Sequence, residues 1–454
     1  MSDYKQLFRD KKITVMGLGL LGRGVAVTKF LAEAGADLLV TDLKDKKELK
    51  PSLDKLKKYK NIEYVLGRHR LGDFEHRDMI IKAAGVPIGS KYIERAKENN
   101  IPVEMDASLF AKIVKGRTEA EAPDVTLIGV TGTRGKSTVT HLIHHMLEVD
   151  RKEKKQRSQF THLAGNVRDT ATLPLLDKIR DDDRVVIELD SWQLQGFGDA
   201  EISPDLSVFT NFLPDHLNYY GNMRSYFMDK AHIFRYQVDG NYIVVGQSAY
   251  EAIQKYYQGE IHGTMALARE NRVPYDWELW APGIHMRQNV ALAMQVGEIM
   301  DLESDVIRRA AESFRGVEGR MEYVKLVRGA EVYNDNNATS PEATIAALKS
   351  FPERNVVLIT GGTDKNLDYS KLTDQINEKV KRLILIPGTA TDKIRKNLRI
   401  SSSEHDSLEE AFEQAVDAAS SGDVILFSPA SSSFGLFTNE YERNDQFLDI
   451  ARSF

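Results

Sequence analysis

Lys136, Ser137 and Thr138 follow a glycine-rich turn, and these residue types at this spacing could bind the phosphates of a nucleotide. The stretch VTLIGVTGTRGKSTVT at 125–140 is typical of a buried strand, a loop and the start of a helix. Backbone N–H groups of such a loop surround an anion, a lysine neutralises phosphate charge, and a hydroxyl can bind Mg²⁺. The motif is a variant, because Val130 stands where the usual spacing has its first glycine. We expect an ATP site made of Gly132, Thr133, Arg134, Gly135, Lys136, Ser137 and Thr138.

A second glycine motif lies near the start of the chain. The stretch ITVMGLG at 13–19 reads as a short strand, and Gly17, Gly19 and Gly22 complete a G-x-G-x-x-G pattern. Asp42 ends the next strand, about twenty residues further on, where dinucleotide-binding folds place the acid that binds a ribose. These residues alone predict dinucleotide binding. A later strand that runs into a turn at Gly85 leaves another phosphorylated nucleotide, or a turn with only a packing role, as alternatives.

Three further positions have side chains that could take part in phosphate chemistry. Glu188 lies near the end of a predicted strand at 185–189, and carboxylates at such ends commonly hold Mg²⁺ beside a phosphate loop. His216 follows another apolar run on a predicted loop, where a structural histidine is the alternative. Lys230 lies in a helical stretch among aromatic residues, which indicates a partly apolar setting, with a solvated lysine as the alternative.

Length and composition limit the class of protein. A chain of 454 residues is too long for one ordinary core. The formal charge of -6 argues against a general nucleic-acid binder, and the absence of cysteine excludes disulfides and thiolate chemistry. No apolar run approaches the roughly 18 residues of a membrane span, and the polar first residues do not resemble a signal peptide. We therefore expect a cytoplasmic protein.

The patterns divide the chain into three α/β stretches. Helical and strand patterns alternate again from residue 316, which favours a parallel sheet with helices on both faces. The charged segment 115–124 resembles a linker. The serine-rich stretch 428–435 is predicted to be a loop at the carboxyl edge of a strand, where open α/β sheets bind ligands. The predicted domains are residues 1–117, 118–315 and 316–454.

The motifs, taken in order, resemble those of the Mur ligases of bacterial peptidoglycan synthesis. The resemblance covers nearly the whole chain and is closest to the members that add D-glutamate to UDP-N-acetylmuramoyl-L-alanine. It implies a Rossmann-like N-terminal domain for the UDP substrate, a central P-loop ATPase-type domain, and a Rossmann-like C-terminal domain that binds the amino acid and closes on ATP. The blocks that carry it include GLGLLG, KAAGVP, TGTRGKST, ELDSWQL, TNFLPDHLNYYG, DKAHIF, NDNNATSPEAT and SPASSSFGLF.

The resemblance also implies roles for individual residues. It assigns catalysis to Lys136, Glu188, His216 and Lys230, and two Mg²⁺ ions to Ser137, Glu188, His216 and a CO₂-derived carbamate on Lys230. It adds Asn289, Arg320 and Asp335 to the ATP site, and it assigns the amino acid to Thr339, Lys365, Ser433 and Phe434. It assigns the UDP substrate to Gly19, Leu20, Leu21, Gly22, Asp42, Leu43, Lys44, Gly85, Asn166 and His216.

The activity that the resemblance implies is an ATP-dependent amide ligation through an acyl phosphate. The substrates would be UDP-N-acetylmuramoyl-L-alanine, glutamate and ATP, with no nucleic-acid or membrane partner and a monomeric chain. Several alternatives stay open at this point. They are an L-glutamate-specific or different Mur step, a folylpolyglutamate-type synthetase, an NAD-dependent oxidoreductase of the Rossmann type, and an inactive nucleotide-binding homologue.

The sequence departs from the family pattern at five positions, namely Arg134, Asp190, Met286, Gly319 and Asn337. The last of these matters most, because many related ligases have a lysine there, near the transferred phosphate. Arg134 brings a new positive charge into the phosphate loop, and we interpret it as a replacement for the lost cation. Neutral drift at both positions is the alternative.

Overall fold

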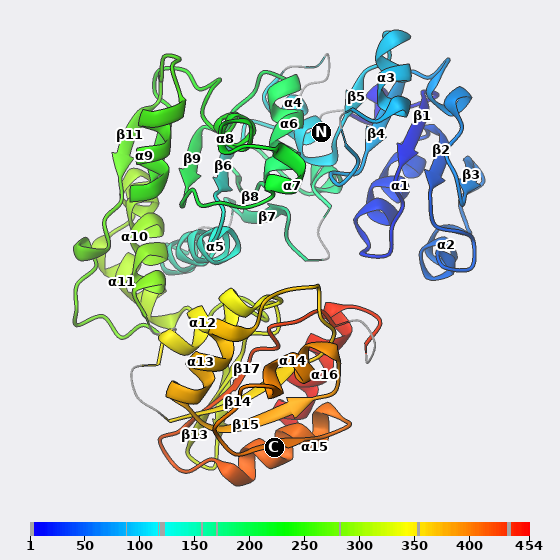
Figure 1. Ribbon diagram of the computed structural model, residues 1–454. Coiled ribbons are helices and arrows are strands. Elements are labelled where there is room, and N and C mark those ends of the chain that lie inside the picture. The colour runs from blue at the N-terminus through cyan, green and yellow to red at the C-terminus, as the bar shows by residue number, and fades with distance from the viewer. Residues whose placement is uncertain are drawn as a thin grey trace. The chain divides into compact units, whose positions relative to one another are not determined.

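The computed structural model describes residues 4–87, 89–116, 118, 123–155, 158–168, 171–280, 283–351, 355–433 and 437–454, except the side chain of Asn218. Three β-sheets form within these ranges, and they follow one another along the chain (Figure 1). The chain divides into two compact units. The first unit is Met1–Arg272 with Ala291–Ile307, and the second unit is Val273–Val290 with Arg308–Phe454.

The first sheet has the strand order β3-β2-β1-β4-β5, and its strands are parallel. Its strands β1, β2 and β4 are largely buried on both faces, as expected of a parallel sheet, whereas the edge strand β3 is only partly buried. The strands are β1 (Lys12–Met16), β2 (Asp37–Asp42), β3 (Ile62–Leu66), β4 (Met79–Lys82) and β5 (Val103–Glu104). The helices are α1 (Arg23–Glu33), α2 (Lys50–Leu56), α3 (Lys91–Glu98) and α4 (Asp106–Val114), with short 3₁₀ turns at Tyr4–Leu7 and Leu71–Phe74.

The second sheet has the order β11-β10-β9-β6-β8-β7, again with parallel neighbours. Its strands are β6 (Thr126–Thr131), β7 (Thr161–Gly165), β8 (Arg184–Glu188), β9 (Leu206–Phe209), β10 (Tyr242–Val245) and β11 (Thr264–Leu267). The helices of this stretch are α5 (Lys136–Glu153), α6 (Ser191–Asp199), α7 (Leu217–Tyr220), α8 (Met223–Ala231), α9 (Gln247–Tyr256), α10 (Ile284–Ile299) and α11 (Ser304–Ser313), with 3₁₀ turns at Leu173–Asp177 and Glu270–Arg272.

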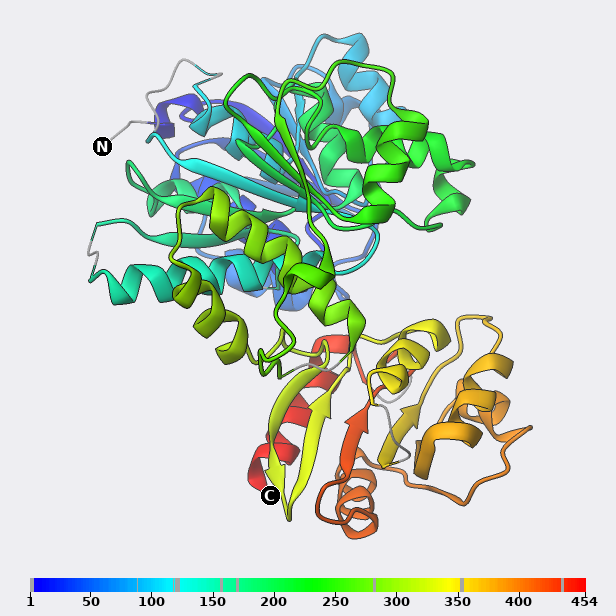
Figure 2. The ribbon, with the colours of Figure 1, turned by 90° about the vertical axis from the view of Figure 1, so that its left-hand side faces the viewer.

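The third sheet has the order β12-β13-β17-β14-β15-β16. Helices α12 to α14 pack on one face and helices α15 and α16 on the other, each against its own apolar cluster (Figure 2). The strands are β12 (Glu322–Val327), β13 (Ala330–Asn334), β14 (Val356–Gly361), β15 (Val380–Ile386), β16 (Ser402–Glu404) and β17 (Val424–Phe427). The helices are α12 (Pro341–Lys349), α13 (Ser370–Lys379), α14 (Thr389–Arg395), α15 (Leu408–Ala418) and α16 (Glu440–Ser453).

The observed α/β architecture confirms the predicted fold class. Several strands were not anticipated, namely β3, β5, β7, β10, β11, β12 and β16. Among them β12 also differs in direction, because it pairs antiparallel with β13 and forms a hairpin at the sheet edge. The domain boundaries at 117 and 315 stay predictions. Half of the predicted linker at 115–124, namely residues 117 and 119–122, lies outside the described residues. None of the described helices combines the length and the apolar character needed to span a membrane.

Asp106 joins the helix that follows the first sheet to a turn that belongs to the second. It begins α4, and its buried carboxylate accepts hydrogen bonds from the backbone N–H groups of Thr172 (2.8 Å) and Leu173 (2.7 Å). Burial raises the pKa of Asp106, while these two backbone hydrogen bonds act in the opposite direction. The carboxylate therefore satisfies two buried N–H donors that are 66 and 67 residues away along the chain.

We predict that Asp106→Ala lowers the free energy of unfolding by about 2–4 kcal/mol, because two buried N–H groups lose their acceptor. Chemical denaturation measures this change. Asp54→Ala, which removes an exposed carboxylate from α2, is the matched control and should change the value by less than about 0.5 kcal/mol. Equal stability of the Asp106 variant and the wild type would contradict the assigned role.

Candidate functional site

The carboxyl edge of the second sheet brings three predicted segments together. In the parallel register Glu188 lies beside Val130 of β6 on one side and beside Gly165 of β7 on the other. The phosphate loop follows β6, and Asn166 follows β7 directly. Because neighbouring parallel strands end at the same edge, the loop, Glu188 and Asn166 lie next to one another.

The phosphate loop depends on two glycines with left-handed backbone angles. Gly132 has a φ of +148°, and a Cβ atom there would lie 1.9 Å from Thr210 Oγ1. Gly135 has a φ of +79° and forms the N-terminal cap of α5. A side chain at Gly132 would force the loop away from the end of β9, so this position requires glycine.

The loop is held by the segment after β9. Thr133 N–H donates to Asn211 O (3.0 Å), and Arg134 N–H donates to Asn211 Oδ1 (2.9 Å). The Thr133 hydroxyl accepts a hydrogen bond from Leu213 N–H (3.0 Å). Our sequence interpretation did not include Asn211, although its place after the strand next to β6 was a usable signal.

Lys136 and Ser137 begin helix α5 at the loop. The Lys136 ammonium donates to the Gly132 and Thr133 carbonyl oxygens, both at 3.1 Å, so the side chain lies folded over its own loop. Ser137 is buried in the first turn, and Thr138 follows it. The positive charge and the helix N-terminus are therefore together at one place, which is the arrangement that binds phosphate.

Glu188 is a buried carboxylate with one unsatisfied oxygen. Its side chain is 2% exposed, and Asn166 Nδ2 lies 3.5 Å from Oε1. Oε2 has no hydrogen-bond partner among the described residues. A buried carboxylate oxygen is costly when left unsatisfied, so this atom has the chemistry of a ligand for a cation. No group of three His, Cys, Asp or Glu side chains able to hold a metal forms within the described ranges, so a cation here needs further ligands.

Lys230 lies under the phosphate loop. Its side chain is 1% exposed, and its Nζ donates to Gly132 O (2.9 Å) and to Thr131 Oγ1 (3.3 Å). The same nitrogen lies 5.0 Å from the ring centre of Tyr226. Burial, followed by the nearby Lys136 charge, lowers the pKa of Lys230 well below its ordinary value. The buried environment therefore favours the neutral amine. The side chain lies in partly apolar surroundings, as the flanking aromatic residues had indicated.

His216 lies among aromatic side chains at the start of α7. Its backbone is left-handed, with a φ of +51°. Its ring lies 4.7 Å from Trp192 and 5.9 Å from Tyr226, and its Nε2 lies 3.7 Å from Asp215 Oδ2. The imidazole therefore lies in tilted contact with Trp192 and in edge-on contact with Tyr226, and it is 38% exposed.

Asp190 has a local structural role. Its carboxylate accepts a hydrogen bond from Gln193 N–H (2.8 Å), and Gln193 Oε1 accepts one from Asp190 N–H (3.1 Å). These two bonds form a capping box at the start of α6. This cap explains why an aspartate is suited to the position.

The first sheet presents the predicted UDP site at its own carboxyl edge. Asp42 accepts hydrogen bonds from the backbone N–H groups of Gly19 and Lys44, both at 2.9 Å, so its carboxylate holds the glycine loop to the end of β2. Gly22 has a φ of +85° and caps α1. A Cβ atom on Gly85 would meet open space. Three apolar side chains around the loop are exposed, Leu20 (44%), Leu21 (53%) and Leu43 (67%).

Arg23 connects this glycine loop to the second sheet. It is the first residue of α1, and its Nη2 donates to Gly165 O (3.1 Å) and to Asn166 Oδ1 (3.3 Å). Asn166 in turn faces Glu188. Our sequence interpretation did not include Arg23, because its partners are more than 140 residues away and no local pattern marks them.

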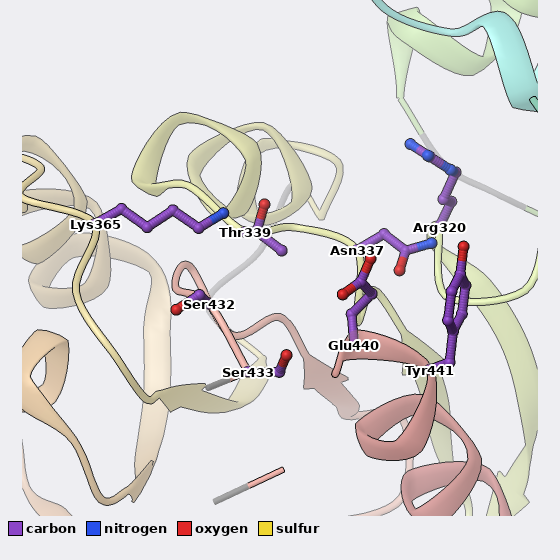
Figure 3. A pocket seen from close by; sticks show the side chains of 8 residues that line it. All are labelled: Arg320, Asn337, Thr339, Lys365, Ser432, Ser433, Glu440 and Tyr441. Carbon is purple, nitrogen blue, oxygen red and sulfur yellow. The ribbon is translucent and has the colours of Figure 1, made fainter. Parts of the chain in front are cut away.

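A cavity of about 260 Å³ in the second unit gathers most of the predicted amino-acid residues (Figure 3). Thr339, Lys365 and Ser433 line it, whereas Phe434 lies outside the described residues. Burial, followed by the Arg443 charge, lowers the pKa of Lys365. The full lining is Arg320, Asn337, Thr339, Lys365, Ser432, Ser433, Glu440 and Tyr441, of which we had not predicted Ser432, Glu440 and Tyr441.

Asp335 lies outside this lining and is buried. It accepts hydrogen bonds from Ser428 Oγ (2.8 Å) and from Met321 N–H (3.2 Å). Burial raises the pKa of Asp335 to about 7, against the smaller opposing effects of these bonds and of Arg320. Asn289 lies half-buried on α10, and Met286 of the same helix is buried.

Three further positions differ from the family pattern, namely Gly319, Asn337 and Met286. Gly319 has a φ of +69°, and a Cβ atom there would lie 3.0 Å from Asn444 Oδ1 and 3.1 Å from Asn337 Nδ2, so a histidine would be strained. Asn337 accepts a hydrogen bond from Asn336 Nδ2 (3.2 Å). Nothing in the structure explains the change to Met286.

The sheets, the phosphate loop and the buried carboxylate beside it define a nucleotide-binding α/β protein of three domains. Family models match all three stretches: a Mur ligase MurD-like N-terminal domain at residues 11–104, a Mur ligase middle domain at 130–299, and a Mur ligase glutamate ligase domain at 319–431. The chain belongs to the Mur ligase family, and it is a ligase.

Two relatives have the name UDP-N-acetylmuramoylalanine--D-glutamate ligase. The protein of Borreliella afzelii is 37% identical over 467 residues, which cover 97% of this chain and 98% of the relative. The protein of Roseiflexus sp. is 35% identical over 484 residues, which cover 98% of this chain and 99% of the relative.

Solved structures share the fold at low sequence identity. UDP-N-acetylmuramate-alanine ligase MurC from Thermotoga maritima has a TM-score of 0.60 at 19% identity and covers 98% of this chain and 99% of its own. MurF ligase from Thermotoga maritima, in complex with ADP, has a TM-score of 0.55 at 16% identity and covers 91% of this chain and 94% of its own. These likenesses confirm the three-domain α/β fold.

The pKa of Asp335 leads to a prediction about stability and pH. Because the folded pKa is raised to about 7, the fold favours the protonated carboxyl. The contribution of the protonated Asp335 carboxyl to the free energy of unfolding is fully present at pH values below its unfolded pKa near 4. This contribution is lost as the pH rises through about 7. We predict that the wild type loses roughly 2–4 kcal/mol of stability relative to Asp335→Asn between about pH 4 and pH 8.

Denaturation of both proteins across this range measures the difference, and other titrating groups cancel in the comparison. The amide of the Asn variant can accept from Met321 N–H and donate to Ser428 Oγ, so it resembles the protonated acid. A difference that stays constant with pH would contradict the raised pKa.

Proposed function

We propose that this protein joins D-glutamate to UDP-N-acetylmuramoyl-L-alanine and converts ATP to ADP and phosphate in doing so, in the cytoplasmic stage of peptidoglycan synthesis. The observation that carries the proposal is the Lys136 loop with the unsatisfied Glu188 carboxylate at the same sheet edge. The names of the relatives, which match nearly the whole chain, support the substrates. The glycine motif and Asp42 alone would also suit a dinucleotide, but the Asp42 carboxylate already accepts hydrogen bonds from Gly19 and Lys44 N–H, and the relatives that match nearly the whole chain are ligases.

The reaction needs activation of the alanyl carboxylate. A carboxylate is a poor acceptor for an amine, because its carbon is shielded by negative charge and its oxygen is a poor leaving group. In the proposed route a carboxylate oxygen attacks the γ-phosphorus of ATP and ADP leaves, which gives an acyl phosphate. The glutamate amine then attacks the acyl carbon, loses a proton, and expels inorganic phosphate.

The phosphate loop would stabilise the first step. The loop N–H groups and the Lys136 ammonium can bind the β- and γ-phosphates, and Lys136 would exchange its present carbonyl acceptors for phosphate oxygens. Charge neutralisation and positioning account for most of the catalysis of phosphoryl transfer. Holding the reactants in line can lower the barrier by about 7–11 kcal/mol.

The residues beside the loop fit a Mg²⁺ ion. Ser137 and Glu188 offer the oxygen ligands that Mg²⁺ prefers, and the unsatisfied Oε2 of Glu188 supports this assignment. His216 is the third residue that we assign to the metal region. When bound, Mg²⁺ supplies positive charge that neutralises the transferring phosphoryl group.

Lys230 fits a carbamate. Its lowered pKa favours the free amine, whose lone pair can attack the carbon of CO₂, and the new N–C bond forms as the amine loses a proton. The product carries a negative charge where the lysine carried a positive one. A second Mg²⁺ site at Lys230 would then have an anionic ligand at a position where the sequence has no acidic residue.

The two remaining substrates have separate positions in the proposal. The glycine loop of the first sheet, with Leu20, Leu21, Leu43 and Lys44, would bind the uridine diphosphate, and Asn166 and His216 the muramoyl-alanine part. Arg23 would fix the orientation of the Asn166 amide by its hydrogen bond to Oδ1. Thr339, Lys365 and Ser433 line a cavity that could bind the carboxylates of the amino acid.

A phosphate-release assay tests the proposed function. We predict that purified protein with ATP, Mg²⁺ and UDP-N-acetylmuramoyl-L-alanine releases phosphate with D-glutamate, and at least about tenfold more slowly with L-glutamate, meso-diaminopimelate or lysine. Lys136→Ala should abolish the release, because the transferring phosphate loses its main cation. Release that is independent of the muramoyl substrate, or that is fastest with another amino acid, would overturn the assignment.

The carbamate has a test of its own. We predict that Lys230→Ala lowers turnover at least about a hundredfold, and that added formate or acetate partly restores it by supplying a carboxylate. Lys178→Ala, which removes an exposed lysine, is the control and should keep wild-type turnover. Full activity of Lys230→Ala without an added carboxylate would refute the carbamate.

A further inference from the structure

We propose that the carboxylate of Glu440 binds the α-ammonium group of the incoming amino acid in the cavity of the second unit. This proposal rests on the proposed function and makes it more specific. It adds a contact with the ammonium group to the contacts that Lys365 and Ser433 could form with the carboxylates of the amino acid. Glu440 thereby becomes a specificity-determining residue for the ligation.

Glu440 lies at the cavity, and within the described residues its carboxylate has no hydrogen-bond or ion-pair partner. It is the first residue of α16, and it lines the cavity together with Lys365 and Arg320. Its backbone carbonyl accepts a hydrogen bond from Asn336 Nδ2 (2.9 Å), which holds the residue in place. Its carboxylate forms no hydrogen bond or ion pair with another residue in the part of the chain that the structure describes.

The arrangement of charges suits a zwitterion. Figure 3 shows Lys365 extending toward Thr339 from one side, while the Glu440 carboxylate lies beside Asn337. Glutamate carries two carboxylates and one ammonium group at neutral pH. A pocket with cations alone would attract any diacid, whereas an anion placed apart from the cations also selects for the amine.

Helix α16 also has a buried cation, Arg443, in addition to the cavity residues Lys365 and Arg320. Arg443, three residues after Glu440, is fully buried and donates to Asn336 Oδ1 (2.7 Å) and Asn336 O (2.9 Å). Its charge lowers the pKa of Lys365, whereas the charge of Glu440 acts in the opposite direction. Glu440 is therefore close enough to influence the cation that we assign to the carboxylates.

The cap of helix α16 does not require Glu440. The side chain of Asn439 accepts hydrogen bonds from Tyr441 N–H (2.9 Å) and Glu442 N–H (3.0 Å). The Glu442 carboxylate accepts one from Thr438 N–H (2.5 Å). Because neighbouring side chains already satisfy the first turn, a role in capping explains Glu442 better than Glu440.

The test compares D-glutamate with glutarate, which is the same diacid without the amine. Steady-state phosphate release gives the KM for D-glutamate, and competition gives the inhibition constant of glutarate. We predict that Glu440→Gln raises the KM for D-glutamate about tenfold and lowers the inhibition constant of glutarate at least about threefold. The KM values for ATP and for the UDP substrate should change less than about twofold.

Opposite changes for the two ligands separate the proposed contact from a general loss of structure, which would weaken both. Glu442→Gln is the control in the same helical turn and should leave the ratio of the two constants at the wild-type value. Glu440→Asp should lie between the wild type and Glu440→Gln. Weaker binding of both ligands, or no change in either, would overturn the assignment of Glu440.

The outcomes also distinguish this inference from the proposed function. If the wild type releases no phosphate with D-glutamate, the function is wrong. If the wild type uses D-glutamate but Glu440→Gln shows no opposite changes, the function stands and the role of Glu440 is wrong.

Discussion

The parallel register of three strands in the second sheet fixes the chemistry of the first unit. Val130 of β6, Glu188 of β8 and Gly165 of β7 lie side by side, so the phosphate loop, a buried carboxylate and Asn166 emerge at one edge. A shift of the register by one residue would turn Glu188 to the other face of the sheet. The hydrogen bond from Lys230 to the Gly132 carbonyl then ties helix α8 to the same loop.

The charges of this site follow from burial. Lys230 and Glu188 are almost completely buried, and Oε2 of Glu188 has no hydrogen-bond partner among the described residues, so it retains the chemistry of a cation ligand. In the second unit the buried Arg443 and the cavity residues Lys365 and Glu440 form a separate arrangement of charges. In our account the first arrangement activates a carboxylate, and the second selects the amine that replaces the phosphate.

Sequence patterns predicted those parts of the protein that depend on local chemistry. Lys136 and Glu188 were identifiable because a strand, a glycine turn and a terminal carboxylate leave local signals. Arg23, Asn211 and Glu440 were not, because their roles come from partners that lie far away in the sequence, or from a cavity. The hairpin strand β12 was also missed, since its pairing with β13 differs from the surrounding parallel pattern.

The fate of the alanyl carboxylate oxygen distinguishes activation of this carboxylate from every other route to the amide. UDP-N-acetylmuramoyl-L-alanine labelled with heavy oxygen in that carboxylate is converted with ATP and D-glutamate, and the released inorganic phosphate is analysed by mass spectrometry. We predict that each phosphate carries one heavy oxygen, because the carboxylate oxygen attacks the γ-phosphorus and leaves with it. Amide formation with unlabelled phosphate would contradict activation of the carboxylate at the phosphate loop.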